Sequence, residues 1–233
     1  MLDSLSTQDQ VIKMSRFNFE MTVSKLRCFG GRQWINDECV NFLMKIFERN
    51  DYENGLKGDD NYMKSFFFNC FFMTTLLDGA QHDENKYSYK RVTRWTKNDD
   101  IFARKFVFLP INVANTHWLN IYVDMEKKKI IYNDPCFSKN KKYLRIVWRY
   151  LQDESMSKRG IALEVDEWSC IFNEAIPGQC NGYDCGVFLI AIIHCIYQNG
   201  GINDHSFLQS AMPELRIFYC LLCLRGNYNL NNF

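Results

Sequence analysis

The sequence is poor in the residues that mark linkers and low-complexity chains: of its 233 residues, only 12 are glycine and 4 are proline. Neither sign of charge is in excess, because 28 Lys and Arg stand against 27 Asp and Glu, for a formal net charge of +1. That balance removes the usual electrostatic argument for non-specific binding to nucleic acid. The apolar share of 47% is that of an ordinary globular chain with one large domain or two small ones.

A segment long and apolar enough to cross a bilayer is also missing. The longest apolar run without a charge, Gly186 to Tyr197, falls short of the roughly 18–20 residues that a membrane span needs. The N-terminus, MLDSLSTQDQ, has neither the basic start nor the apolar core of a secretory signal. We therefore expect a soluble intracellular protein, nuclear or cytoplasmic, that acts as a monomer and binds neither membranes nor nucleic acid.

Ten cysteines are scattered along the chain, but a disulfide framework belongs to short secreted chains, and this chain is neither short nor evidently secreted. Cys220 and Cys223 have the spacing of half a zinc site, yet no second Cys or His pair lies at the usual distance. Because both fall within the apolar run 217–224, they favour a buried helix over a metal site. We expect most of the thiols to be buried and inert, which leaves the question of whether one of them is activated.

The expected elements run from a helix through a set of strands to further helices, an order typical of an α+β domain. Asn36 is a candidate N-cap, and Val40, Leu43, Met44 and Phe47 follow with the spacing of one buried helical face. Polar loops are expected at 51–60 and 78–87, and the aromatic segment 66–77 fits a strand or a helix equally well. Further strands are expected at 105–112, 118–124, 129–133 and 162–172, and further helices at 140–157, 185–198 and 214–225.

Two of these strands, 118–124 and 129–133, flank the charged turn Met125 to Lys128 and should form an antiparallel hairpin. His117 precedes the first strand and Asp134 follows the second. Because a hairpin brings those two ends together, we expect the imidazole and the carboxylate to lie within hydrogen-bond distance. A carboxylate on one ring nitrogen orients a histidine to act as a base through the other.

Cys185 is the thiol best placed for activation, because it opens the apolar helix at 185–198. A helix N-terminus and a neighbouring imidazolium both lower a thiol pKa, and the thiolate is the nucleophile. Gln179 lies six residues earlier in the sequence and is a candidate to form an oxyanion hole with the backbone N–H of Cys185. Asp184 is interpreted as the cap of the same helix.

Each of these residues also has a purely structural interpretation. A lone histidine beside an apolar strand is more often structural than catalytic, and Cys185 is also explained as one more buried thiol. On spacing alone, both interpretations stay open for the histidine, the aspartate and the thiol. Of the other histidines, His194 is expected in the core of an apolar helix, whereas His82 and His205 lie in polar segments and are expected to be solvated.

The residues around this site resemble those of a known family. His117-Trp118, Asp134 and Gln179-Cys180-Asn181-Gly182-Tyr183-Asp184-Cys185-Gly186 are similar to the active-site signature of the SUMO-specific (sentrin/ubiquitin-like-protein) cysteine proteases, in the same order and with the same gaps. Trp34-Ile35-Asn36-Asp37-Glu38 is similar to the family's Trp-Leu-Asn-Asp helix start. The resemblance implies a catalytic domain at 22–225, an N-terminal extension at 1–21 and a C-terminal tail at 226–233. It also implies a papain-like α+β fold, with a central mixed or antiparallel sheet flanked by helices, and no metal or organic cofactor.

The resemblance assigns a catalytic role to four residues. Cys185 is the nucleophile that attacks the substrate carbonyl, and His117 takes its proton and later protonates the leaving amine. Asp134 orients His117, and Gln179 stabilises the oxyanion of the tetrahedral intermediate.

Three further residues are expected to bind the substrate. Trp34 and Trp118 would clamp its Gly-Gly tail in a narrow tunnel, because two indole faces leave room only for a backbone without side chains. Asp37 would contact a basic residue of the modifier.

We therefore predict a cysteine protease that cleaves after the C-terminal Gly-Gly of a ubiquitin-like modifier, with SUMO as the first expectation and its conjugates or its precursor as substrates. The catalytic residues do not distinguish this activity from the same chemistry on ubiquitin or on the cullin-modifying ubiquitin-like protein. An acetyltransferase on the same fold is disfavoured by Asp134 and the tryptophan pair, and an inactive modifier-binding module by the presence of all four catalytic groups. Pro135-Cys136 follows Asp134 where many members carry Ser, a departure that removes no catalytic atom, and the long loop at 78–87 leaves the modifier preference open.

Overall fold

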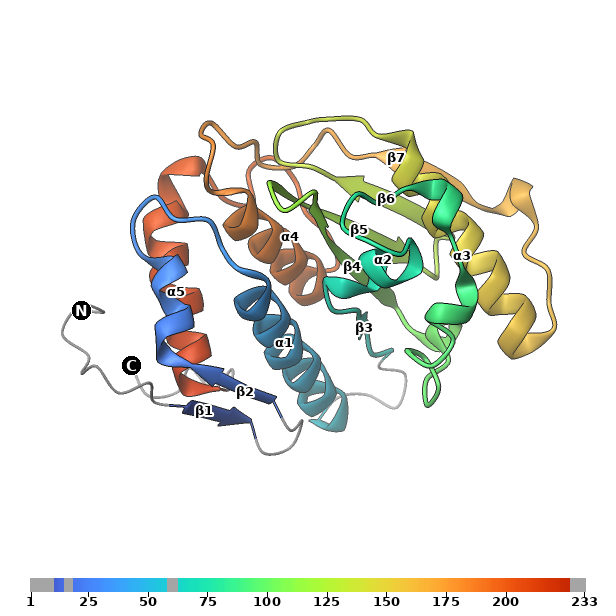
Figure 1. Ribbon diagram of the computed structural model, residues 1–233, viewed down its shortest axis with the longest axis horizontal. Helices are drawn as coiled ribbons and strands as arrows, with labels where there is room; N and C mark the ends of the chain where they lie inside the picture. The colour runs from blue at the N-terminus through green and yellow to red at the C-terminus, as the bar shows by residue number, and fades with distance from the viewer. Residues whose placement is uncertain (1–10, 15–18, 58–62, 227–233) are drawn as a thin grey trace.

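A five-stranded mixed sheet forms the middle layer of the protein in a computed structural model that describes residues 11–14, 19–57 and 63–226 (Figure 1). The strands lie in the order β3 (Phe66–Phe67), β4 (Phe106–Val113), β5 (His117–Asp124), β6 (Lys129–Asn133) and β7 (Ser169–Phe172). The β4–β5 and β5–β6 pairs are antiparallel, whereas β3 pairs with β4 and β7 with β6 in parallel. A separate antiparallel ribbon joins β1 (Val11–Met14) to β2 (Phe19–Thr22), so the expected boundary at residues 21 and 22 falls inside β2.

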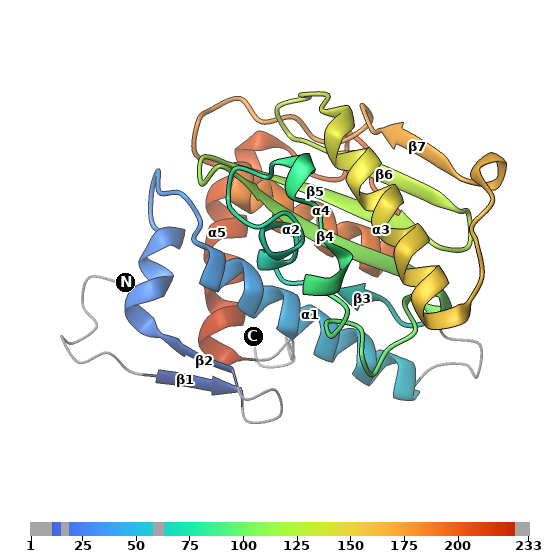
Figure 2. The same ribbon diagram turned by 45° about the vertical axis from the view of Figure 1, so that its right-hand side comes forward.

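The α-helices of the described residues cover both faces of this sheet. They are α1 (Asp37–Lys57), α2 (Phe71–Leu76), α3 (Lys141–Arg159), α4 (Cys185–Asn199) and α5 (Met212–Arg225). α1 and α4 cover one face with α5 packed outside them, and α2 and α3 cover the other (Figure 2). Because side chains alternate along a strand, Phe108 and Tyr122 join the apolar cluster of the first face, and Leu109 and Ile121 that of the second. The predicted α+β architecture is confirmed.

The first helix begins where the sequence predicts and ends later. The Asn36 side chain caps it by accepting a hydrogen bond of 2.8 Å from the backbone N–H of Cys39, and the predicted apolar face is buried. The prediction of a loop at 51–60 is wrong for residues 51–57, because α1 continues to Lys57. Asp51 is buried rather than solvated, since its carboxylate accepts the backbone N–H of Ser65 at 2.8 Å. Residues 58–60 of that expected loop lie outside the described residues.

Other elements match the sequence in position but differ in detail. Residues 66–77 contain both candidates, the short strand β3 and the helix α2. The strand expected at 162–172 is limited to β7, because a 3-10 helix, Val165–Glu167, interrupts it. His82 is buried, not solvated: its ring bonds the Tyr143 hydroxyl at 3.0 Å, and burial lowers its pKa to about 4. His205 is exposed, as expected.

The cysteines are less uniformly buried than the sequence suggests. All ten are free thiols, of which five are buried, two are half-buried and three are exposed, the last being Cys136, Cys170 and Cys180. Cys220 and Cys223 are buried on α5, in agreement with a core helix. None of the helices formed by the described residues combines the length and the apolar character of a membrane span.

A buried ion pair connects α5 to the segment that precedes α4. The guanidinium of Arg216 bonds the Asp184 carboxylate at 2.6 and 3.0 Å, with exposed fractions of 4% and 2% for the two residues. The same guanidinium donates to the backbone carbonyls of Cys28, Gln33 and Tyr183 at 2.9–3.2 Å. Asp184 is the N-cap residue of α4, as the sequence predicts, but its carboxylate is bound to Arg216 and makes no side-chain capping hydrogen bond.

Replacing Arg216 by methionine should destabilise the protein strongly. The apolar volume is kept, but Asp184 would remain buried without its counter-charge, and breaking such a pair costs about 3–5 kcal/mol of the free energy of unfolding. Urea denaturation measures this loss. The matched control is Arg145→Met, because Arg145 pairs with Glu84 on the surface, where an ion pair contributes about 1 kcal/mol or less. Equal losses in the two variants would contradict a structural role for the buried pair.

Candidate active site

The β5–β6 hairpin brings His117 and Asp134 together, as predicted. The Nε2 atom of His117 lies 2.8 Å from Oδ1 of Asp134, and the carboxylate is almost completely buried, whereas the imidazole is partly open to solvent. The strands pair from Asp124 opposite Lys129 to Asn120 opposite Asn133, so the start of β5 and the end of β6 lie at the same end of the sheet. The distance between them is therefore set by the register of the sheet.

Asp134 is held by several donors in addition to the imidazole. Its Oδ1 accepts the backbone N–H of Cys136 at 2.8 Å, and its Oδ2 accepts the hydroxyls of Ser138 and, at 3.4 Å, Tyr132. Burial alone would raise the pKa of Asp134, but the hydrogen bonds from His117, Ser138 and the Cys136 backbone outweigh it and hold the pKa below its usual value. The carboxylate is thus kept ionised and fixed in orientation.

The imidazole of His117 is held in its charged form. Burial works to lower its pKa, but the hydrogen bonds to the Asp134 carboxylate and to the Cys185 side chain raise the pKa to about 9. Because Nε2 is engaged by Asp134, the other ring nitrogen is the atom available to the sulfur. The geometry thus places a positively charged imidazolium beside the sulfur of Cys185.

Cys185 is the first residue of α4 and is buried. A helix N-terminus carries a partial positive charge that favours an anion, and the sulfur also interacts with His117. The next residue, Gly186, has no room for a side chain: a Cβ there would lie 2.7 Å from Cβ of Ile35 and 3.1 Å from Cδ1 of Trp118. This close approach sets the start of α4 against the segment that carries Trp34.

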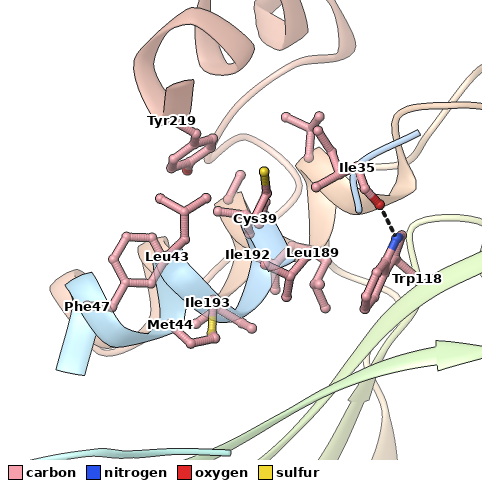
Figure 3. Packing of buried hydrophobic residues seen from close by; sticks show 14 of the residues in the cluster. Ile35, Cys39, Leu43, Met44, Phe47, Trp118, Leu189, Ile192, Ile193 and Tyr219 are labelled. Atoms are coloured by element: carbon pink, nitrogen blue, oxygen red, sulfur yellow. Dashed lines mark hydrogen bonds between the residues drawn. The ribbon is translucent and has the colours of Figure 1, made fainter. Parts of the chain in front are cut away.

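Cys185 and His117 line a surface pocket of about 320 Å³ together with Trp34, Trp118 and Asp37. Trp118 is 4% exposed, and its indole N–H donates to the carbonyl of Ile35 at 2.9 Å (Figure 3). Trp34 is 50% exposed, and its indole N–H donates to the carbonyl of Gly182 at 3.0 Å. Both rings are therefore fixed at the pocket by a hydrogen bond.

Asp37 lines this pocket, whereas Gln179 does not. Asp37 lies in the first turn of α1 and lines the pocket, half-buried. Gln179 lies outside the residues that line it: its side-chain amide donates to the backbone carbonyl of Asn181, and its Oε1 is 3.7 Å from the sulfur of Cys136. The Gln179 amide thus donates within its own loop, to the backbone carbonyl of Asn181 and, at 3.5 Å, to the side-chain oxygen of the same residue.

The structure adds residues that the sequence analysis missed. Ser138 supports Asp134, Arg216 supports Asp184, and the exposed ring of Phe71 at the start of α2 lines the pocket. Phe71 lies in an aromatic run whose other members are mostly buried, so its type gave no signal of exposure. Ser138 lies only four residues after Asp134, and its residue type gave no signal of the contact, whereas Arg216 lies 32 residues from Asp184.

One group in the described part of the chain has the spacing of a metal site. Ligand atoms of His117, Asp134 and Cys136 lie within 4.8 Å of one another. His117 and Asp134 are already joined by a hydrogen bond, so the group is part of this site and not a separate centre.

Comparison with known proteins gives a consistent result. Residues 33–224 match the model of the Ulp1 protease family, C-terminal catalytic domain. The chain is 32% identical over 203 residues to ubiquitin-like-specific protease 1A of Arabidopsis thaliana, covering 85% of this chain and 38% of that protein. It is 31% identical over 211 residues to sentrin-specific protease 2 of Pongo abelii, covering 90% of this chain and 33% of that protein. The chain thus spans about a third of the length of these curated relatives.

A solved structure has the same fold. The C-terminal Ulp1 protease domain in complex with Smt3, the yeast ortholog of SUMO, is similar with a TM-score of 0.73 and 27% identity, covering 95% of this chain and 90% of that one. The expected papain-like fold is confirmed by this match. Because the family model covers most of the chain, the protein belongs to the Ulp1 protease family of cysteine peptidases, in the part that forms the C-terminal catalytic domain.

Proposed function

We propose that this chain hydrolyses the bond after the C-terminal Gly-Gly of a ubiquitin-like modifier, with SUMO as the preferred modifier. The observation that carries the proposal is the hydrogen-bonded pair of His117 and Asp134 next to Cys185, on the wall of a pocket that Trp34 and Trp118 also line. SUMO is favoured because the similar yeast Ulp1 domain was solved in complex with Smt3, the yeast ortholog of SUMO.

The first half of the reaction forms a thioester. The Cys185 thiolate attacks the carbonyl carbon of the terminal glycine, and the negative charge moves to the carbonyl oxygen. The backbone N–H of Cys185 and the side-chain amide of Gln179 are the proposed donors to that oxyanion. His117 then gives its proton to the leaving nitrogen, the lysine side chain of a conjugate, while Asp134 keeps the ring in place.

The second half releases the modifier. His117, now neutral, takes a proton from water, and the resulting hydroxide attacks the thioester carbonyl. The Cys185 thiolate leaves and the imidazolium forms again, so the starting pair is restored. Removal of SUMO from conjugates and processing of its precursor use the same steps and differ only in the leaving nitrogen.

Two flat rings explain why the substrate ends in glycines. Trp34 and Trp118 are each fixed by an indole hydrogen bond, one to the loop before Cys185 and one to the segment after Trp34. A peptide that passes between them to reach Cys185 must have no side chains there. Asp37, at the same pocket, is the proposed contact for a basic residue of the modifier.

Replacing Cys185 by alanine should lower turnover by about 10⁴-fold or more, because the nucleophile is lost, and should leave binding of the modifier intact. The measurement uses C-terminally electrophilic probes of SUMO, ubiquitin and the cullin modifier, which label an active thiol covalently. We expect labelling by the SUMO probe that disappears in Cys185→Ala. The matched control is Cys180→Ala, an exposed thiol of the same loop, whose labelling should be normal.

The outcomes of the probe experiment separate mechanism from substrate. Labelling of Cys185 by the ubiquitin or cullin-modifier probe alone would keep the mechanism and reject SUMO. Labelling that persists in Cys185→Ala would reject the nucleophile. Absence of labelling by all three probes would reject the proteolytic function and favour an acyltransferase or a binding module.

The activity should decline on the alkaline side as His117 loses its proton, at a pH near 9. Burial lowers the pKa of this imidazole and the Asp134 carboxylate raises it, so Asp134→Asn should move the alkaline limb of kcat/KM to lower pH. The raised pKa of His117 also makes the stability of the fold depend on pH. Its contribution to the free energy of unfolding is fully present below about pH 6.5 and is lost as the pH rises through about 9. Activity profiles and urea denaturation between pH 5 and about 10 test both statements. An unchanged limb in Asp134→Asn would show that the carboxylate does not set the protonation of His117.

A substrate with alanine in place of the penultimate glycine should be cleaved at least roughly tenfold less efficiently, because its methyl group meets the indole faces. Trp34→Ala should reduce this discrimination as well as the overall kcat/KM. Tyr52→Ala, which alters an exposed aromatic residue farther along α1, should leave the ratio unchanged. Equal cleavage of the two substrates by the unaltered protein would exclude the clamp.

A further inference from the structure

Two thiols outside the proposed mechanism are in contact. The sulfur atoms of Cys28 and Cys39 lie 3.5 Å apart. Cys28 belongs to a 3-10 helix, Val23–Phe29, and Cys39 to the first turn of α1. Within the residues that the structure describes, no other two cysteine sulfurs are in hydrogen-bond contact.

The backbone on both sides of this contact is fixed. The carbonyl of Cys28 accepts a hydrogen bond from Arg216 at 3.1 Å, and the N–H of Cys39 donates to the Asn36 side chain at 2.8 Å. Asn36 in turn donates to the carbonyl of Lys25 at 2.9 Å, which ties the 3-10 helix to the start of α1. Because a disulfide bond is about 2.05 Å long, the two sulfurs need to approach by about 1.5 Å to form one.

The two thiols differ in a way that suits stepwise oxidation. Cys28 is half-buried and open to a small reagent, whereas Cys39 is buried and its side chain lies within the apolar packing of α1 (Figure 3). The hydrogen bond with Cys39 holds the pKa of the Cys28 thiol below its usual value, and the charge of Arg216 acts in the same direction. Cys28 is therefore the thiol that reacts first, and Cys39 the one that resolves the adduct.

We propose that Cys28 and Cys39 form a redox-modification site whose substrate is a low-molecular-weight disulfide of the glutathione type. The Cys28 thiolate attacks one sulfur of glutathione disulfide, forming a mixed disulfide and releasing one glutathione thiolate. Cys39, losing its proton, then attacks the Cys28 sulfur and releases the second glutathione. The two cysteines lose two electrons and two protons in total, and glutathione disulfide is reduced to two glutathiones.

A disulfide between Cys28 and Cys39 would join the two ends of a segment whose residues line part of the pocket. Trp34 and Asp37 lie between Cys28 and Cys39 in the sequence, and Arg216 joins the Cys28 carbonyl to Asp184, next to Cys185. Oxidation of Cys28 and Cys39 therefore restricts the segment with Trp34 to the position that it has in this structure, and the thiol of Cys185 is not consumed. That consequence for substrate binding rests on the proposed function, whereas the modification site does not.

The experiment uses the full chain with Cys185→Ala, so that the proposed nucleophile does not react and no activity is measured. The protein is treated with graded ratios of oxidised to reduced glutathione, remaining thiols are alkylated, and trypsin fragments are analysed by mass spectrometry. We expect the fragments 28–32 and 33–45, separated by cleavage after Arg32, to be joined by a disulfide that reductant removes. The oxidised protein should melt roughly 5–10 °C higher, because a short loop has been closed.

Three variants in the same background distinguish the steps. Cys39→Ser should retain glutathione on Cys28, because the resolving thiol is gone, and Cys28→Ser should leave the buried Cys39 unmodified. The matched control Cys195→Ser, another half-buried thiol, should still join 28–32 to 33–45. The proposal is overturned if glutathione modifies the exposed Cys170 while fragments 28–32 and 33–45 stay alkylated, or if Cys39 is joined to the fragment with Cys220 or Cys223 instead. Since no outcome depends on proteolysis, failure of the proposed function leaves this test intact.

Discussion

The buried guanidinium of Arg216 is the interaction on which the arrangement of the site depends. A charge in the interior must be paired and hydrogen-bonded, and Arg216 meets that requirement by collecting acceptors from three separate parts of the chain. One is Cys28, one is Gln33 beside the exposed tryptophan, and one is the loop ending at Asp184. Through Arg216, α5 thus connects the pocket wall to the loop that precedes Cys185.

The side chains of the candidate site come from two elements that pack directly on each other, the β5–β6 hairpin and α4. His117 opens β5 and Asp134 directly follows β6, so their separation follows from the pairing of these two strands, and Cys185 opens a helix that packs on β5. Gly186 permits the closest part of that packing, because any side chain there would push the helix away from Ile35. A site built this way needs little rearrangement to form, in keeping with the general advantage of preorganised sites.

How far the sequence predicts this protein depends on whether the relevant contacts are local. The hairpin signal placed His117 next to Asp134, and the apolar run after Cys185 marked the helix, because periodicity and turns are local properties. His82 was misjudged, since its polar neighbours give no hint that the loop folds under α3 and buries the ring against a tyrosine. Arg216 was missed because its partner lies 32 residues away in an unrelated segment. Residue type and spacing do not predict such contacts between segments that are distant in the sequence.

The turn at the far end of the hairpin has a practical consequence. Strands rise by about 3.4 Å per residue, so the seven steps of β5 from His117 to Asp124 place the turn roughly 24 Å from the imidazole. Glu126 and Lys127 are exposed there, and lengthening a surface loop adds little to the entropy of its closure. A fluorophore, an affinity tag or a linker to a solid support can therefore be inserted at this turn, so that the protein is immobilised with its pocket open to solution.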